Sequence, residues 1–142
     1  MLRLADSADI AKYGEYRRGP GAGFTGRITG EGAFTARPFR YHVYGGWFCP
    51  WSHQVAIIRE LAGLHDIVTM SYVDGERDGR GWAFRQRYGP DPVNGFTLLR
   101  QAYDATVENY TGHVSVPTLW DRFSSRVVSN DPTAIGLDLA TR

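Results

Sequence analysis

The residue best suited to chemistry in this sequence is Cys49, the only cysteine of the chain. It stands directly before a stretch with helical spacing, and Pro50 after it suits the first position of a helix. A cysteine at a helix start meets free backbone N–H groups and the positive end of the helix dipole. Both favour the thiolate, the nucleophilic form of a thiol. The pattern predicts a reactive cysteine; the alternative is a buried structural one.

The residues that follow Cys49 limit the kinds of disulfide exchange and metal binding that this site could support. Ser52 stands where a dithiol site would carry its second cysteine, so an external thiol must complete any disulfide exchange. Pro50 and Trp51 complete the helix start. A haem attachment sequence needs a second cysteine, and Cys49 with His53 is only half of a metal site. We therefore expect no metal, and we expect His53 to be a packed or capping side chain.

The first half of the chain predicts a strand, a helix and a strand around Cys49. A β-prone run covers 41–44, a helix follows to about residue 63, and a second strand is expected over 66–73. The helix has four residues at helical spacing: Trp51, Val55, Ile58 and Ala62. This unit favours a parallel crossover between the two strands. Residues 74–95 form a long polar loop, which is either functional or disordered.

The second half predicts a helix, two strands and a final helix. One side of the first helix is marked by Phe96, Leu99, Tyr103 and Thr106. A strand at 114–120 pairs with 126–128 across a turn, and Asp131-Pro132 begins the last helix as N-cap and first turn. The order β-α-β-α-β-β-α, with a mixed sheet, predicts an α/β thioredoxin-like fold over 39–142. Residues 1–38 are expected to be an extended or partly disordered arm.

Pro117 interrupts the predicted strand at 114–120 and matches a feature of thioredoxin-like folds. There a proline at the head of the third strand is typically cis and faces the cysteine. The residue before it, here Val116, then offers its backbone N–H and C=O to an extended thiol peptide. We favour a cis Val116-Pro117 bond; the alternative is a trans proline in an edge strand.

Composition excludes several classes of partner. The chain has 142 residues, the size of one domain, and a net charge of +1. That charge gives no reason to expect nucleic acid or an anionic membrane as a partner. The sequence has neither a run of about 20 apolar residues nor a secretory signal at its start. A lone thiol fits a reducing compartment, so we expect a cytoplasmic protein.

Taken together, these residues resemble the N-terminal domain of the glutathionyl-hydroquinone reductases, also called xi-class glutathione transferases. The resemblance covers roughly residues 30–137 and rests on the segments 40–44, 49–53, 81–84, 110–117, 119–121 and 128–130. It implies an enzyme that reduces glutathionyl-hydroquinone-type thioethers through a mixed disulfide on Cys49. Glutathione or another low-molecular-weight thiol is the co-substrate, and an aromatic thioether is the acceptor. Trp82 is implied to pack on the bound thiol, and Val116 to pair with its backbone.

Three positions depart from the family pattern in the thiol-binding residues. His113 stands where the family has an arginine, so a fixed bidentate cation becomes a ring that is mostly neutral at pH 7. Asp131 replaces a longer acid, and Pro132 replaces a serine that contributes its backbone N–H. The grip on a γ-glutamyl group is therefore altered or lost. A different low-molecular-weight thiol, or a degenerate site, would explain these changes.

The family also continues with an all-helical domain that shapes the acceptor pocket and the dimer, and this chain ends before it. The sequence is therefore interpreted as a fragment whose full-length protein could be a homodimer. Two hypotheses remain open. The first is a thiol-dependent oxidoreductase that acts through Cys49. The second is a catalytically degenerate thioredoxin-fold binding module or an inactive fragment.

Overall fold

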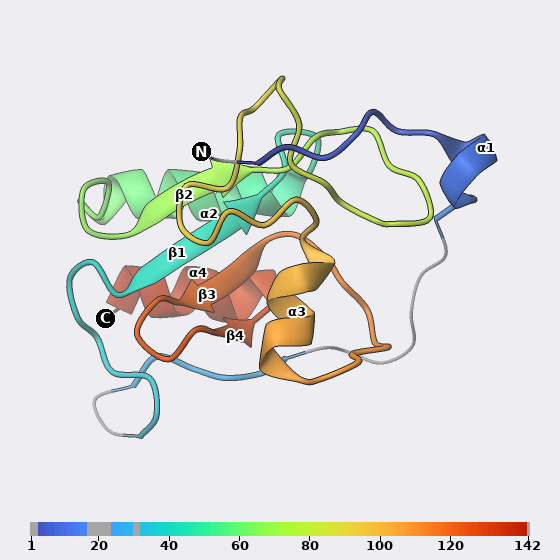
Figure 1. Ribbon diagram of the computed structural model, residues 1–142. Coiled ribbons are helices and arrows are strands. Elements are labelled where there is room, and N and C mark those ends of the chain that lie inside the picture. Colours follow the sequence, from blue (N-terminus) through green and yellow to red (C-terminus); the bar gives the residue numbers. More distant parts are fainter. Residues whose placement is uncertain (1–2, 17–23, 30–31, 142) are drawn as a thin grey trace.

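A four-stranded mixed sheet forms the centre of the molecule (Figure 1). The structure, a computed structural model, describes residues 3–16, 24–29 and 32–141. The strands are β1 (Tyr41–Gly45), β2 (Thr69–Tyr72), β3 (Thr118–Asp121) and β4 (Arg126–Ser129). Their order is β2-β1-β3-β4; β1 runs parallel to β2 and antiparallel to β3, and β3 pairs antiparallel with β4. This is the predicted arrangement of a parallel pair and a hairpin.

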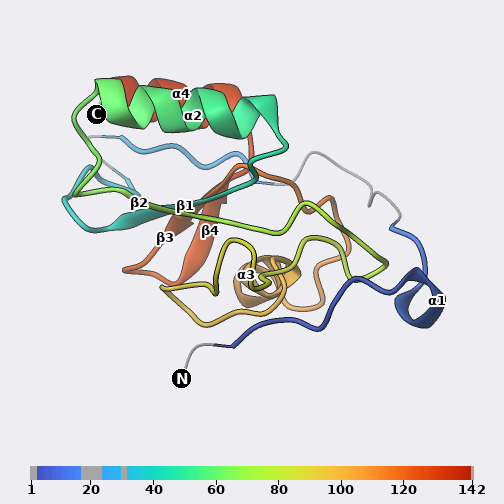
Figure 2. The same cartoon turned by 90° about the horizontal axis from the view of Figure 1, so that it is seen from above.

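Helices cover both faces of the sheet. They are α1 (Ile10–Tyr13), α2 (Pro50–Leu61), α3 (Arg100–Thr106) and α4 (Pro132–Thr141). Figure 2 shows α2 and α4 side by side on one face, with α3 on the other. The predicted order from β1 to α4 and the thioredoxin-like fold are thus confirmed. Within the described ranges, no helix is both long and apolar enough to cross a membrane.

The strands divide the apolar residues between two cores because successive side chains point to opposite faces of a sheet. Val43 of β1 packs under α2 and α4 with Leu119 and Val128, whereas Tyr44 packs toward α3 with Trp120. All five residues are buried. The sheet therefore separates a core under α2 and α4 from a core under α3, and β1 contributes to both.

Two predicted elements are shorter than the sequence indicated. The strand expected over 66–73 begins at Thr69, because the guanidinium of Arg59 holds the carbonyl groups of His65 and Val68 in a turn. The helix expected from residue 96 begins at Arg100, because the Gln101 side chain accepts the N–H groups of residues 97 and 98. In each case a side chain ends the regular pattern by satisfying backbone groups locally.

The buried side of α2 includes only part of the set of residues at helical spacing. Trp51 is 56% exposed, and Ala62 beyond the helix end is also exposed. The buried side of α2 is formed by Ser52, Val55 and Arg59. The helix is confirmed, and its buried side includes two polar side chains, Ser52 and Arg59, each of which makes a hydrogen bond to the backbone.

The described parts of residues 1–38 lie against the domain at two places. Ile28 is buried in the core under α2 and α4, and its N–H donates to Asp138 of α4 at 2.8 Å. Arg27 adds an ion pair to the same carboxylate at 2.7 Å. Residues 5–14 lie along the 74–85 loop, where the short helix α1 was not predicted. The glycine-rich stretch at 19–23 lies outside the described residues.

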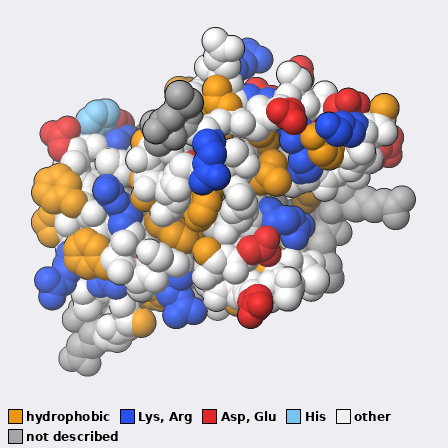
Figure 3. Space-filling view, viewed as in Figure 1, with side chains coloured by type: hydrophobic (Ala, Val, Ile, Leu, Met, Phe, Trp, Pro, Cys, Tyr) orange, Lys and Arg blue, Asp and Glu red, His pale blue; other side chains and the backbone are white. Residues whose placement is uncertain are grey.

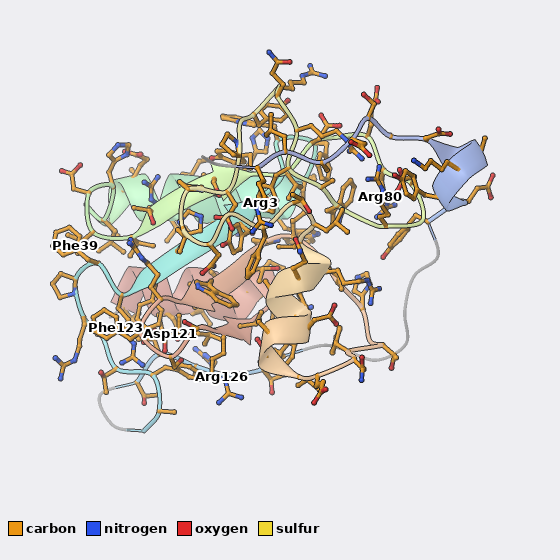
Figure 4. All side chains as sticks on the ribbon, viewed as in Figure 1. Arg3, Phe39, Arg80, Asp121, Phe123 and Arg126 are labelled. Atoms are coloured by element: carbon orange, nitrogen blue, oxygen red, sulfur yellow. The ribbon has the colours of Figure 1, made fainter. Side chains whose placement is uncertain are left out.

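Two buried aspartates organise the long 74–95 loop. Asp78 accepts the N–H groups of Asp9 and Arg80, and Asp91 accepts those of residues 93, 94 and 96. Both are fully buried. Figure 4 shows Arg80 beside α1, and Figure 3 shows acidic and basic side chains gathered at that corner of the molecule. The loop is thus ordered by carboxylates that replace regular backbone pairing.

Candidate functional site

Cys49 is the N-cap residue of α2, at the end of the sheet where β1 stops. Its N–H donates to the carbonyl of Gly46 at 3.0 Å, and its own carbonyl accepts the N–H of His53 at 3.2 Å. The thiol is half-buried. Pro50 occupies the first helical position, as the sequence predicted. Cys49 therefore stands at the helix start, although its side chain makes no capping hydrogen bond to the first turn of α2.

The loop before Cys49 is held by close packing against α2. Ser52 is fully buried, and its hydroxyl accepts the N–H of Gly46 at 3.1 Å. A Cβ atom on Gly45 would lie 2.7 Å from the Met70 side chain and 3.4 Å from Cβ of Ser52. Ser52 thus acts as a support of the helix start, in the position where a dithiol site would have its second cysteine. His53 is exposed and pairs with the carbonyl of Trp47.

The Val116-Pro117 bond is cis, as predicted, and it faces the cysteine. The Cys49 thiol lies 3.7 Å from the carbonyl oxygen of Val116, within the range of a sulfur hydrogen bond. Pro117 is buried and Val116 is half-buried. The structure therefore brings Cys49, Val116 and Pro117 together at one end of the sheet. Asp121 and Arg126, labelled in Figure 4, lie at the opposite end.

Tyr103 of α3 supports this proline segment from behind. Its hydroxyl lies 2.8 Å from Oγ1 of Thr118 and 3.2 Å from the carbonyl oxygen of Ser115. Burial raises the pKa of Tyr103 to about 12, so the phenol stays protonated and can donate. Sequence analysis placed Tyr103 on the inner side of its helix but did not assign this contact with the site.

A row of stacked side chains lies beside the cysteine. Phe48 stacks on Trp82 with ring centroids 4.3 Å apart. The guanidinium of Arg77 lies 4.1 Å from the Trp82 ring centre and 3.6 Å from that of Tyr16. We call these four residues the aromatic row. The Tyr16 hydroxyl lies 3.5 Å from Nδ1 of His113, so the row connects with the segment that leads to the cis proline.

The remaining predicted residues lie at the start of α4. Asp131 is exposed, and its carboxylate accepts the N–H groups of Thr133 and Ala134 at 3.0 and 3.4 Å. It is the predicted N-cap, and Pro132 is the first helical residue. Asn130 before it is buried and donates to the hydroxyl of Ser115 at 3.1 Å. In this structure the Asp131 carboxylate is therefore engaged with its own helix.

Sequence reasoning missed Tyr16 and Arg77, which complete the aromatic row. Tyr16 lies in the arm and Arg77 in the polar loop, and neither segment has a periodicity that would pair them. The Asp78-Gly79 dipeptide, a frequent turn former, was a signal that the loop is ordered. In the described part of the chain, no group of three or more His, Cys, Asp or Glu residues could hold a metal ion.

Comparison with known proteins places this geometry in a family. Residues 48–142 match the family described as glutathione S-transferase, N-terminal domain. The glutathionyl-hydroquinone reductase PcpF of Sphingobium chlorophenolicum is 38% identical over 89% of this chain and 38% of its own length. The glutathionyl-hydroquinone reductase YqjG of Escherichia coli is 37% identical over 75% of this chain and 34% of its own length. The chain thus spans less than half the length of these relatives.

Solved structures of glutathione transferases are also similar to this chain. A xi-class glutathione transferase from Natrialba magadii superposes with a TM-score of 0.79 at 31% identity, over 84% of this chain and 39% of that one. The glutathione-bound structure of YqjG from Escherichia coli gives a TM-score of 0.77 at 30% identity, over 89% of this chain and 45% of that one. The family match over residues 48–142 includes Cys49, the cis proline and the start of α4. The chain therefore belongs to the glutathione S-transferase N-terminal domain family.

Proposed function

We propose that this chain carries the thiol site of a glutathionyl-hydroquinone reductase, with Cys49 as the nucleophile. The observation that carries the proposal is the half-buried Cys49 thiol at the start of α2, 3.7 Å from the carbonyl of Val116. A thiolate is favoured at a helix start, and the backbone before a cis proline can pair with an extended thiol substrate. The resemblance to PcpF and YqjG supports the same chemistry.

The proposed reaction has two steps. The Cys49 thiolate attacks the sulfur of an aryl thioether formed between glutathione and a hydroquinone. The new S–S bond forms as the S–C(aryl) bond breaks, and the aryl carbon takes the electron pair and a proton, which releases the hydroquinone. A second thiol then attacks the mixed disulfide, gives a free disulfide and returns the Cys49 thiolate. The thioether sulfur and the sulfur of the second thiol are each oxidised by one electron and the aryl carbon is reduced by two, so the electrons balance and Cys49 is regenerated.

The thiol is glutathione or a low-molecular-weight thiol with similar groups. The similar solved structure of YqjG has glutathione bound, which supports this choice. Val116 is proposed to pair with the backbone of this thiol, and Trp82 to form one side of its site. His113, Asp131 and Pro132 are proposed to lie near its γ-glutamyl end, where the Asp131 carboxylate must exchange its helix-cap bonds to reach a ligand.

Intact-mass spectrometry tests this function directly because the chain has a single cysteine. After incubation with a glutathionyl-hydroquinone, we expect one glutathionyl group on the protein and an equal amount of free hydroquinone. Added glutathione should then remove the adduct. Cys49→Ser should form no adduct and release no hydroquinone. A correctly folded chain that forms no adduct with either the thioether or oxidised glutathione would instead be a non-catalytic binding module.

A further inference from the structure

The guanidinium of Arg77 lies against two aromatic rings, those of Tyr16 and Trp82. Its central carbon lies 3.6 Å from the Tyr16 ring centre and 4.1 Å from the Trp82 ring centre. The N–H donors of a guanidinium lie in its own plane, so contact of its face with an aromatic ring leaves them able to bond to another group. The side chain is half-buried. Two ring contacts therefore restrict the orientation of Arg77, and the side chain remains partly exposed.

Arg77 differs from neighbouring arginines in having no acidic partner among the residues that the structure describes. The arginines that hold the arm, the loop and the sheet are each paired with an aspartate, namely Arg27, Arg40, Arg80 and Arg85. Arg77 makes no hydrogen bond and no ion pair with any residue in the described ranges. A structural arginine normally uses its donors, so an oriented guanidinium with free donors indicates a site for an external anion.

The position of Arg77 relates this anion site to the cysteine. Trp82 on one side of the guanidinium stacks on Phe48, the residue directly before Cys49. Tyr16 on the other side reaches His113, four residues before the cis proline. The aromatic row thus spans the two segments that flank the sulfur. An anion bound to Arg77 would therefore lie near the segments that lead to Cys49 and to the cis proline.

We propose that Arg77 is a specificity-determining residue that binds a carboxylate of the incoming thiol through paired N–H···O bonds. The planar fork of a guanidinium matches a carboxylate, and the two rings fix its orientation before the ligand arrives. The proposal rests on the proposed function for the identity of the ligand as a carboxylated thiol. The proposal adds Arg77, which lies in the 74–95 loop and contacts Tyr16 of the arm, to the residues that select this thiol.

Binding of S-methylglutathione tests the proposal without any reaction at Cys49, because its sulfur is blocked. Its dimethyl ester, in which both carboxylates are masked, is the matched ligand. Isothermal titration calorimetry should show that Arg77→Met binds the acid about tenfold more weakly than the unmodified chain, as expected for loss of a charge-assisted pair. The ester should bind both proteins equally. Arg77→Lys, which keeps the charge without the fork, should fall between them.

Arg87→Met is the control for charge, since Arg87 is an exposed arginine of the same loop that lies against Tyr88. This variant should bind S-methylglutathione within about twofold of the unmodified chain, as expected for an exposed side chain away from the site. Equal weakening of acid and ester in Arg77→Met would assign the residue a packing role only and overturn the proposal. Unchanged binding of the acid, or no binding of the acid to the unmodified chain, would also overturn it.

The proposed function and the role of Arg77 fail in different ways. If the acid binds through Arg77 but no glutathionyl adduct forms on Cys49, the carboxylate site stands and the reductase chemistry is wrong. If the adduct forms on Cys49 and Arg77→Met does not change the preference for the acid over the ester, the chemistry stands and the carboxylate site is wrong. Calorimetry and intact-mass spectrometry on the same preparations separate these results.

Discussion

The hydroxyl of Ser52 accepts the backbone N–H of Gly46 at 3.1 Å, and this bond ties the first turn of α2 to the loop that carries Cys49. Both residues are buried. Ser52 stands where a dithiol site has its second cysteine, and here it has a structural role. Its hydroxyl accepts the bond that fixes the path of the backbone leading to Cys49.

Ser52→Ala removes the acceptor of this buried bond. We expect a loss of about 1–3 kcal/mol in the free energy of unfolding, because the Gly46 N–H is left buried without its partner. Urea unfolding followed by circular dichroism measures the loss. Thr133→Ala, at an exposed position of α4, is the control and should change stability by less than about 0.5 kcal/mol. Equal stability of the two variants would show that the bond contributes nothing.

Asp121→Asn breaks the buried ion pair with Arg40, whose two N–H···O bonds both measure 2.8 Å. Burial alone would raise the pKa of Asp121, but hydrogen bonds from Arg40, Ser124 and Phe123 outweigh it and hold that pKa below its ordinary value. Removal of one partner leaves a buried cation, so unfolding should become easier by about 3 kcal/mol.

The matched control for this ion pair is Glu60→Gln, which removes an exposed carboxylate beside His65. Its effect on the free energy of unfolding should stay below about 1 kcal/mol. Chemical denaturation of both variants at pH 7 gives the comparison. If Glu60→Gln costs as much as Asp121→Asn, burial does not govern the strength of these pairs.

His42 makes stability depend on pH. The ring is fully buried between the hydroxyls of Thr69 and Ser71, and burial, aided by Arg122 and Arg59, lowers the pKa of His42 to about 3. The unfolded chain takes up this proton near pH 6.5, whereas the folded chain resists it. Above about pH 6.5 the histidine is neutral in both states and has no effect. As the pH falls from about 6.5 toward 3, stability falls by up to about 1.4 kcal/mol per pH unit.

His42→Gln should lose this part of the pH dependence while keeping side-chain groups that can bond to both hydroxyls. Thermal unfolding from pH 7 to pH 4 measures it. His65→Gln, at an exposed histidine, should retain the slope of the unmodified chain. A slope that is the same in all three proteins would contradict the assignment.

Gly79→Ala should displace the arm. A Cβ atom at this position would lie 2.0 Å from the carbonyl oxygen of Tyr13, and Gly79 also donates its N–H to Gly14 at 2.7 Å. Hydrogen exchange over residues 9–16 should become faster, while exchange in the sheet stays the same. Gly75→Ala, where the nearest atom is 3.5 Å away, is the control in the same loop. Unchanged exchange in the arm of Gly79→Ala would show that this contact does not hold it.

Much of the fold could be predicted from patterns of residues that are close together in the sequence. The β-prone run before Cys49, the proline at the first helical position and the hairpin after Pro117 each agree with the elements observed. These features depend on neighbouring residues, so a single sequence is enough to predict them. The juxtaposition of the cysteine with the cis proline was predicted from a feature that is typical of thioredoxin-like folds.

The remaining features depend on contacts between distant segments. Arg59 and Gln101 end or delay regular structure by bonding to backbone groups, which no periodicity indicates. Tyr16 and Arg77 meet because α1 docks on the loop through Asp78 and Gly79. The turn-forming character of that dipeptide is visible in the sequence. The segment that docks on it is not, because that depends on the three-dimensional path of the arm.

One end of the aromatic row is supplied by a segment that lies outside both cores. Tyr16 belongs to the described residues 3–16, whereas the apolar cores on the two faces of the sheet are built from residue 24 onward. A change in this leading segment can therefore alter the surroundings of Arg77 without replacing any residue of either core.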